Sequence, residues 1–200
     1  MTENIIPHSH AITQQDRIKK LGYKPQLIWF VGLSGSGKST LASALEEKLF
    51  AEGINTYILD GDNIRSGLNK DLDFSDDSRK ENIRRIAEVS KLFVDAGIVV
   101  LTAFITPFED ERNKIKALIG VENYTEIFVN CPLEECEKRD VKGLYAKARR
   151  GEIKNFTGID SPFEEPKNAD LNIPSHQLSI EEGVQRIYDL VKTKIEVGRM

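Results

Sequence analysis

Eight residues, Gly32 to Ser39, read GLSGSGKS and constrain the fold more than any other stretch of this chain. They match the pattern G-x-x-x-x-G-K-[ST] at every fixed position. A short apolar run comes before them, and a segment with helical spacing starts near Lys38. The three glycines let successive backbone N–H groups face one anion, and the helix N-terminus adds partial positive charge. We therefore expect a strand–loop–helix unit that holds phosphate groups, and call Gly32 to Ser39 the phosphate loop.

Within this loop, we expect Lys38 to reach the β- and γ-phosphates of a nucleotide and the Ser39 hydroxyl to ligate Mg²⁺. A GTP-specific switch usually carries N-K-x-D after a later strand, whereas NKDL at Asn69 has the wrong fourth residue and lies too early. ATP and Mg²⁺ are therefore the predicted cofactors. The predicted nucleotide-binding residues of this segment are Gly32, Leu33, Ser34, Gly35, Ser36, Gly37, Lys38, Ser39 and Thr40.

Apolar runs typical of strands buried on both faces alternate with helical segments along the chain. The runs end at Gly32, Asp60, Phe104, Asn130 and Pro174. The clearest helix covers Ser78 to Ala96, where apolar side chains form one stripe. This alternation predicts an α/β fold of the P-loop NTPase type, with about five parallel strands sandwiched by helices and ligands bound at the carboxyl ends of the strands.

The length of 200 residues, 40% of them hydrophobic, suits one core. We predict a single domain over residues 1–200, with a polar leader over 1–25. The stretch from about 139 to 166 is charged, contains glycine and has no clear strand. We interpret it as a lid over the site, and a plain surface loop is the alternative.

Composition also excludes some partners. A net charge of -4 does not suit binding to a nucleic-acid backbone. The first ten residues lack a basic region followed by an apolar run, and about 18 consecutive apolar residues occur nowhere. Cys131 and Cys136 are five apart, which fits reduced packing residues better than a disulfide framework. We predict a cytoplasmic protein with no nucleic-acid or membrane partner.

Asp60 and Asp62 lie at the carboxyl end of the second expected strand, at the same crevice as the phosphate loop. One carboxylate would orient an attacking hydroxyl or accept its proton, and the other would hold the water shell of the metal, as phosphoryl transfer requires. The alternative is helix capping, because Asp62 precedes NIRSGL and is a good N-cap residue.

Basic residues near this crevice suit an anionic acceptor. Arg79 and Asn82 share a helix face and, with Arg65, could clamp phosphate or sulfate oxygens. A solvated helix face is the alternative for Arg79. Arg139 and Arg149 flank the expected lid, where a guanidinium group would neutralise charge on the transferred group and contact the nucleotide.

Longer stretches carry a family resemblance. Besides the phosphate loop and the leader HSHAITQQDR, they are LDGDNIRSGLNKDLDFS, RKENIRRIAEVSKLFVDAGIVVLTAFITPF and CEKRDVKGLYAKARRGEIKNFTGIDSPFEEP. In their order and spacing the chain resembles the adenylylsulfate (APS) kinases over nearly its whole length. Members of that family transfer the γ-phosphate of ATP to the 3′-hydroxyl of APS, giving PAPS and ADP with Mg²⁺. The resemblance implies a homodimer acting in sulfate assimilation, and any ATP sulfurylase partner would be a separate chain.

The resemblance also implies roles for single residues. Asp62 would lie beside the ribose 3′-hydroxyl of APS, and Arg65 would reach its phosphosulfate. Phe74 and Phe156 would sandwich the adenine, for which core packing is the alternative. The further APS-binding residues that it implies are Arg79, Asn82, Ile105, Lys142 and Lys154.

Three positions depart from the family pattern. Many members carry serine where this chain has Thr106, a position described in some as a phosphorylated intermediate. Thr106 keeps a hydroxyl and stays a candidate for that catalytic role, although direct in-line transfer already accounts for the chemistry. Ser66 replaces a histidine, and Asp73 replaces a glycine and adds negative charge near an anionic substrate.

Two other functions remain open from the sequence. One is a P-loop kinase for another small acceptor, such as a nucleoside monophosphate or a sugar acid. The other is a regulatory module that binds APS or PAPS without catalysis, which a chain could achieve without Asp62. The combination of acceptor-side residues favours an adenine nucleotide with a second anion, and the intact Lys38 and Asp62 favour an enzyme.

Overall fold

The structure, a computed structural model, describes residues 6, 8, 10–73 and 75–197. Phe74, one of the expected APS-binding residues, therefore lies outside the described residues. In this part of the chain one sheet of five parallel strands has the order β2-β3-β1-β4-β5. The strands are β1 Leu27–Val31, β2 Thr56–Asp60, β3 Val99–Ala103, β4 Tyr124–Asn130 and β5 Leu171–Pro174. All five expected strands and their parallel pairing are confirmed.

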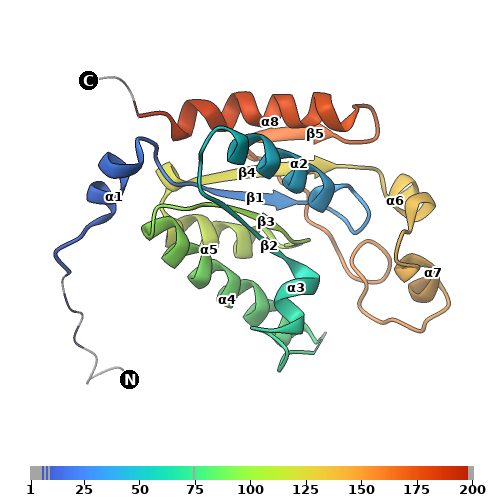
Figure 1. Cartoon of the computed structure of the whole chain (residues 1–200). Coiled ribbons are helices and arrows are strands. Elements are labelled where there is room, and N and C mark those ends of the chain that lie inside the picture. The colour runs from blue at the N-terminus through green and yellow to red at the C-terminus, as the bar shows by residue number, and fades with distance from the viewer. Residues whose placement is uncertain (1–5, 7, 9, 74, 198–200) are drawn as a thin grey trace.

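Helices cover both faces of this sheet, with α2 and α8 on one face and α4 and α5 on the other (Figure 1). The short helices α6 and α7 lie beyond the carboxyl ends of the strands (Figure 1). The helices are α1 Gln14–Leu21, α2 Lys38–Ala51, α3 Gly61–Ser66, α4 Asp76–Asp95, α5 Glu109–Ile119, α6 Leu133–Arg139, α7 Leu144–Arg149 and α8 Ile180–Ile195, with one 3₁₀ turn, η1 Val121–Asn123.

The central strand β1 shows why both faces need helices. Its residues are all fully buried, and alternate side chains enter different cores. Ile28 and Phe30 pack with residues of α2 and α8, whereas Leu27, Trp29 and Val31 pack with residues of α4 and α5. Each large apolar side chain buried in this way contributes about 1.5–3 kcal/mol to folding. The continuous apolar run in the sequence therefore marks a strand at the centre of a three-layer fold.

Helix α4 starts and packs as expected. The Ser75 side chain accepts a hydrogen bond from the Ser78 backbone N–H at 3.4 Å and caps the helix N-terminus. The apolar stripe is buried on the sheet, with Ile86 fully buried and Ile83 and Val94 nearly so. The helix thereby presents its first two turns, with Arg79 and Asn82, at the carboxyl edge of the sheet.

Two helices were not expected from the sequence. Helix α1 lies in the predicted leader, and its Thr13–Asp16 capping box supplies the start signal. The buried Tyr23 that follows donates from its hydroxyl to Gly97 O at 3.1 Å and accepts from Asn55 N at 3.0 Å, so the end of the leader is fixed to the body. Helix α7 lies in the predicted lid. None of the helices in the described ranges is both long and apolar enough to cross a membrane.

Candidate active site

The phosphate loop connects β1 to α2 in a conformation that only glycine adopts easily. Gly35 and Gly37 have φ angles of 74° and 103°. A Cβ atom at Gly32 would lie 2.6 Å from the carbonyl oxygen of Val129, which real side chains do not tolerate. The backbone of β4 therefore closes the back of the loop, and the open side of the loop lies at the N-terminus of α2, where an anion is favoured.

Lys38 is folded into this loop. Its ammonium group donates hydrogen bonds to Gly32 O at 2.9 Å and to Leu33 O at 2.7 Å. The side chain is buried, and this burial lowers the pKa of Lys38 to about 8; the charge of Lys142 acts in the same direction and that of Asp60 in the opposite one. A cation held in the loop in this way is placed to meet nucleotide phosphates.

Ser39 and Asp60, the two residues expected to hold a metal, lie within hydrogen-bond distance of each other. The Ser39 hydroxyl donates to the Asp60 carboxylate at 3.1 Å, so two oxygen groups converge beside the phosphate loop. Mg²⁺ prefers oxygen ligands and usually keeps waters and phosphate oxygens in its shell. The described residues contain no cluster of three or more His, Cys, Asp or Glu side chains able to hold a metal. This pair thus fits a cation bound mainly by nucleotide phosphates and water.

The carboxylate that caps α3 is Asp60 rather than Asp62. Asp60 is the N-cap residue, and its side chain accepts from the Asp62 backbone N–H at 3.0 Å. The alternative role of Asp62 as the N-cap does not hold, because the helix begins at Gly61, two residues earlier than the NIRSGL pattern indicated. Capping holds Asp60 and leaves the Asp62 side chain out of the helix hydrogen bonds, 73% exposed.

Asp62 instead pairs with the lid. Its carboxylate forms an ion pair and hydrogen bond with the ammonium group of Lys142, which comes from the segment between α6 and α7. Both side chains are largely exposed, so the pair contributes little to stability and can open readily. The structure therefore brings together the proposed hydroxyl-orienting carboxylate and one of the expected acceptor-binding lysines.

The two acceptor-side arginines lie close to each other. Burial, and then the positive charge of Arg79, lowers the pKa of Arg65. Arg65 donates to the carbonyl oxygen of Asp73 at 2.9 Å, and Arg79 donates to the carbonyl oxygen of Asn155 in the lid at 2.7 Å. Two neighbouring guanidinium groups are poised for an anion that offers oxygens to both.

Asn82 and Ile105 line the interior side of this region. The nearly buried Asn82 accepts a hydrogen bond on its side-chain oxygen from the Asn69 amide at 2.9 Å, which fixes the turn after α3 to α4. Ile105 is half-buried in the segment that joins β3 to α5. The hydrogen bond of Asn82 and the half-buried position of Ile105 are both compatible with acceptor binding, and the two roles remain predictions.

Phe156 and Lys154 differ in their surroundings, although both come from the lid. Phe156 is 8% exposed and packs edge-on against Tyr145 with ring centroids 5.0 Å apart, inside a small core of lid and α6 residues. The alternative expectation of core packing therefore describes this ring in the present arrangement. Lys154 is exposed, and the described part of the chain gives it no hydrogen bond or ion pair. It is available to an incoming anion.

Of the two arginines expected at the nucleotide, the structure brings one to the phosphate loop. Arg139 donates to Gly35 O and to Ser175 O, both at 3.3 Å, and so joins the loop to the residue after β5. Arg149 pairs with Glu137 at 2.5 Å on the lid surface. The ion pair with α6 explains why Arg149 points elsewhere in this arrangement.

Two residues that no sequence motif singles out also hold the phosphate loop. The Ser175 hydroxyl donates to Ser36 O at 2.7 Å, and the Tyr145 hydroxyl donates to Ser34 O at 2.9 Å. The position of Ser175 just after the last strand was a usable signal, because carboxyl ends of parallel strands meet at one edge. For Tyr145, in the lid helix α7, no local signal exists.

Thr106, the candidate phosphorylated residue, is 1% exposed. Its hydroxyl accepts a hydrogen bond from the Trp29 indole N–H at 2.9 Å. A group transferred to this oxygen would have to displace the indole and bury a dianion, which is costly without paired charge. The structure therefore argues against Thr106 as a phosphate carrier.

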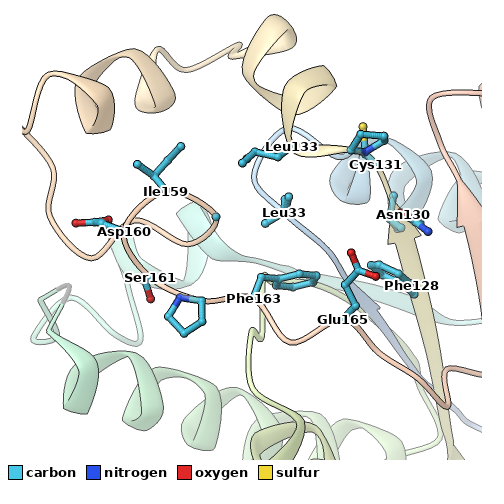
Figure 2. Close-up of a pocket in the computed structure, with 14 residues that line it drawn as sticks. Leu33, Phe128, Asn130, Cys131, Leu133, Ile159, Asp160, Ser161, Phe163 and Glu165 are labelled. Carbon is cyan, nitrogen blue, oxygen red and sulfur yellow. The ribbon is translucent and has the colours of Figure 1, made fainter.

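A cavity of about 460 Å³ lies between the phosphate loop, the end of β4 and the lid segment from Gly158 to Phe163. Figure 2 shows Leu33 of the loop facing this space, with Ile159 and Asp160 from the lid on one side and Phe128 on the other. Among the residues that the structure describes, none of those expected to bind the acceptor lines it. The cavity therefore lies under the segment from Gly158 to Phe163 and does not include the Asp62–Lys142 pair.

Together, these features define a class. A three-layer parallel sheet, a phosphate loop with a buried lysine, a neighbouring serine–carboxylate pair and an exposed carboxylate that meets a lysine of the segment between α6 and α7 are typical of P-loop kinases.

Comparison with known proteins identifies the family. The family model described as adenylylsulphate kinase matches residues 24–174, and the chain belongs to this family. It is 56% identical over 185 residues to a probable adenylyl-sulfate kinase of Halalkalibacterium halodurans, covering 92% of each chain. It is also 56% identical to a probable adenylyl-sulfate kinase of Bacillus subtilis, covering 96% of each. The solved Mycobacterium tuberculosis APS kinase CysC, in complex with AMPPNP and APS, superposes with a TM-score of 0.80 at 49% identity, covering 84% of this chain and 98% of that one.

Proposed function

We propose that this chain is an adenylyl-sulfate kinase that transfers the γ-phosphate of ATP to the 3′-hydroxyl of APS, giving PAPS and ADP. Membership of the family, and relatives of that name at 56% identity over nearly the whole chain, support the proposal. The observation on this chain that supports it is the exposed Asp62 carboxylate. It follows Asp60, which accepts a hydrogen bond from Ser39 of the phosphate loop, and it precedes Arg65, the neighbour of Arg79, on the same helix. A carboxylate between a phosphate donor site and an anion site suits an acceptor that carries both a hydroxyl and an anion.

In the proposed reaction, the phosphate loop and Lys38 hold the β- and γ-phosphates of ATP. Asp62 orients the 3′-hydroxyl and takes its proton while the oxygen bonds to the γ-phosphorus and the bond to the ADP oxygen breaks. Lys142 must move from Asp62 to the substrate anion for this to happen. Ser39 and Asp60 would hold Mg²⁺, which supplies neutralisation of the charge that develops on the phosphate oxygens.

The acceptor side is proposed to bind the rest of APS. Arg65 and Arg79 bind its phosphosulfate oxygens, and Lys154 and Lys142 add positive charge from the lid. Phe156 serves as an adenine platform only after the lid rearranges, since its ring is buried against Tyr145. A cytoplasmic homodimer that works beside a separate ATP sulfurylase chain remains our expectation for the assembly and location.

The test measures ADP release from MgATP with APS, AMP, dAMP or gluconate as acceptor. We expect release with APS, and a loss of at least roughly 100-fold in kcat for Asp62→Asn, because positioned acid–base groups contribute 10² to 10⁴ in rate. Asp189→Asn, at an exposed carboxylate on α8, is the matched control and should keep the wild-type rate. Preference for another acceptor would reject APS as the substrate, and ATP binding without turnover of any acceptor would indicate a sensing module.

A further inference from the structure

The segment from Phe104 to Phe108, which joins β3 to α5, contains an unusual backbone conformation. Thr106 has a φ angle of 42°, in the left-handed region that β-branched residues rarely adopt. Such strain persists only where surrounding contacts enforce it, and it concentrates at functional sites. The question is which contacts hold Thr106 and what they position.

Two buried hydrogen bonds hold this residue. The Trp29 indole N–H donates to the Thr106 hydroxyl at 2.9 Å, and the Arg112 guanidinium group donates to the Thr106 carbonyl oxygen at 3.0 Å. Trp29 and Arg112 are 0% and 3% exposed. Arg112 is itself placed by Glu126 of β4, 3.6 Å away, which accepts from the Tyr124 hydroxyl at 2.8 Å. Thr106 is therefore fixed from β1 on one side and from α5 and β4 on the other.

The Trp29 ring connects Thr106, through Phe104, to the residue between the two carboxylates. It stacks on Phe104, with ring centroids 5.8 Å apart. The Phe104 ring lies directly under Gly61, since a Cβ atom added at Gly61 would be 3.6 Å from its edge. Gly61 separates Asp60 from Asp62 in the sequence. The Gly61 backbone, which joins the two carboxylate residues, thus rests on an aromatic stack whose inner ring is held by the Thr106 hydroxyl.

We propose that Thr106 is a positioning residue: its hydroxyl fixes the Trp29–Phe104 stack that supports Asp60 and Asp62, and it carries no phosphate during turnover. This inference rests on the proposed function, because its kcat and KM measurements use APS as the acceptor. If the Trp29 ring is released, it can rotate, Phe104 can follow, and the Asp62 carboxylate loses its fixed position at the acceptor hydroxyl. Small misplacements of this kind reduce kcat, whereas ATP held by the phosphate loop is little affected.

Thr106→Val tests this, because valine keeps the shape and removes the hydroxyl. We expect kcat to fall about tenfold while KM for ATP changes less than about twofold. Thr106→Ser, which keeps the hydroxyl, should restore most of the rate. Thr102→Val is the matched control: Thr102 is a buried threonine on β3 whose hydroxyl has no hydrogen-bond partner in the described part of the chain. Its kcat should stay at the wild-type value.

Two further measurements separate positioning from covalent catalysis. Trp29→Phe removes the same hydrogen bond from the other side, so the Thr106→Val/Trp29→Phe double variant should be no slower than the slower single variant. Intact-mass measurement of the wild type with MgATP and no acceptor should show no added phosphoryl group. Trp29 is the one tryptophan of the chain, so its emission should shift in Thr106→Val and return toward the wild-type value in Thr106→Ser.

A phosphoryl group found on Thr106, a wild-type kcat for Thr106→Val, or additive losses in the double variant would overturn the inference. If Thr106→Val fails to fold, Trp29→Phe and the mass measurement still decide it. If wild type does not phosphorylate APS, the proposed function fails, and the same variants are compared with whichever acceptor supports ADP release. The emission shift of Trp29 is independent of the substrate in either case.

Discussion

At the scale of single residues, Lys38 has two tasks that conflict. It is buried in the phosphate loop with two carbonyl acceptors, and it must be charged when phosphates are bound. Burial makes the ammonium form unfavourable and lowers the pKa to about 8. Phosphate groups would favour the ammonium form and raise the pKa again. Nucleotide binding and protonation of Lys38 are therefore linked.

This linkage predicts proton uptake. At about pH 8.5 a large fraction of Lys38 is neutral in the free enzyme and charged with ATP bound, so binding should take up as much as about one proton; at about pH 6.5 it should take up almost none through this group. Calorimetry in two buffers of different ionisation enthalpy measures the difference. Lys38→Arg, which stays charged at both pH values, should lose the pH dependence. Equal uptake at both pH values would contradict the linkage.

Other single residues show where sequence reasoning stops. The motif placed Lys38 and Ser39 correctly beside the helix N-terminus, because glycine spacing encodes the loop locally. The sequence around Asp60 and Asp62 does not decide which of the two caps the helix, since both are good caps and the choice depends on where α3 begins. The burial of Thr106 under Trp29 joins residues 77 positions apart, and no local pattern encodes that contact.

At the scale of elements, the strands were predictable, whereas the contacts made by the segment 139–166 were not. Five apolar runs mark five strands because each strand is buried by helices on both faces. Helix α4 follows from its apolar stripe and its Ser75 cap. The lid contacts instead join distant segments, such as Arg79 to Asn155 and Tyr145 to Ser34. These depend on the assembled fold.

The lid segment from Gly158 to Phe163 contacts the phosphate loop at Gly158. A Cβ atom there would lie 3.1 Å from Leu133 and 3.2 Å from Leu33 of the loop, and the φ angle is 91°. Gly151, elsewhere in the lid, has a φ angle of 75° with nothing within 4 Å. The two glycines share a left-handed conformation and differ in the contact with the loop.

We therefore predict that Gly158→Ala and Gly151→Ala differ in their effects. Both substitutions should lower the free energy of unfolding by about 1–2 kcal/mol through left-handed strain. Gly158→Ala should lower it by about 1 kcal/mol more through overlap, and should raise KM for ATP by displacing Leu33. Urea unfolding and steady-state kinetics measure these effects. Equal free energies of unfolding and equal KM values for ATP in the two variants would mean that the segment from Gly158 to Phe163 does not constrain the phosphate loop.

At the scale of the whole molecule, donor and acceptor groups meet at one edge. The phosphate loop follows β1, the carboxylates follow β2, and Ser175 follows β5, so every one of these groups lies at the carboxyl ends of parallel strands (Figure 1). The lid, with α6 and α7, comes over the same edge. The fold class and this shared edge were predictable from the alternation of strands and helices. The pairing of Asp62 with Lys142 was not, because it depends on how the lid lies.

The most direct test of the proposed transfer asks which hydroxyl receives the phosphate. ADP release from MgATP is measured with APS, with 2′-deoxy-APS and with 3′-deoxy-APS at saturating concentrations. The proposed geometry places Asp62 at the 3′-hydroxyl, so 2′-deoxy-APS should be phosphorylated and 3′-deoxy-APS should bind as an inhibitor without turnover. ADP release with 3′-deoxy-APS at the rate seen with APS would contradict transfer to the 3′-hydroxyl.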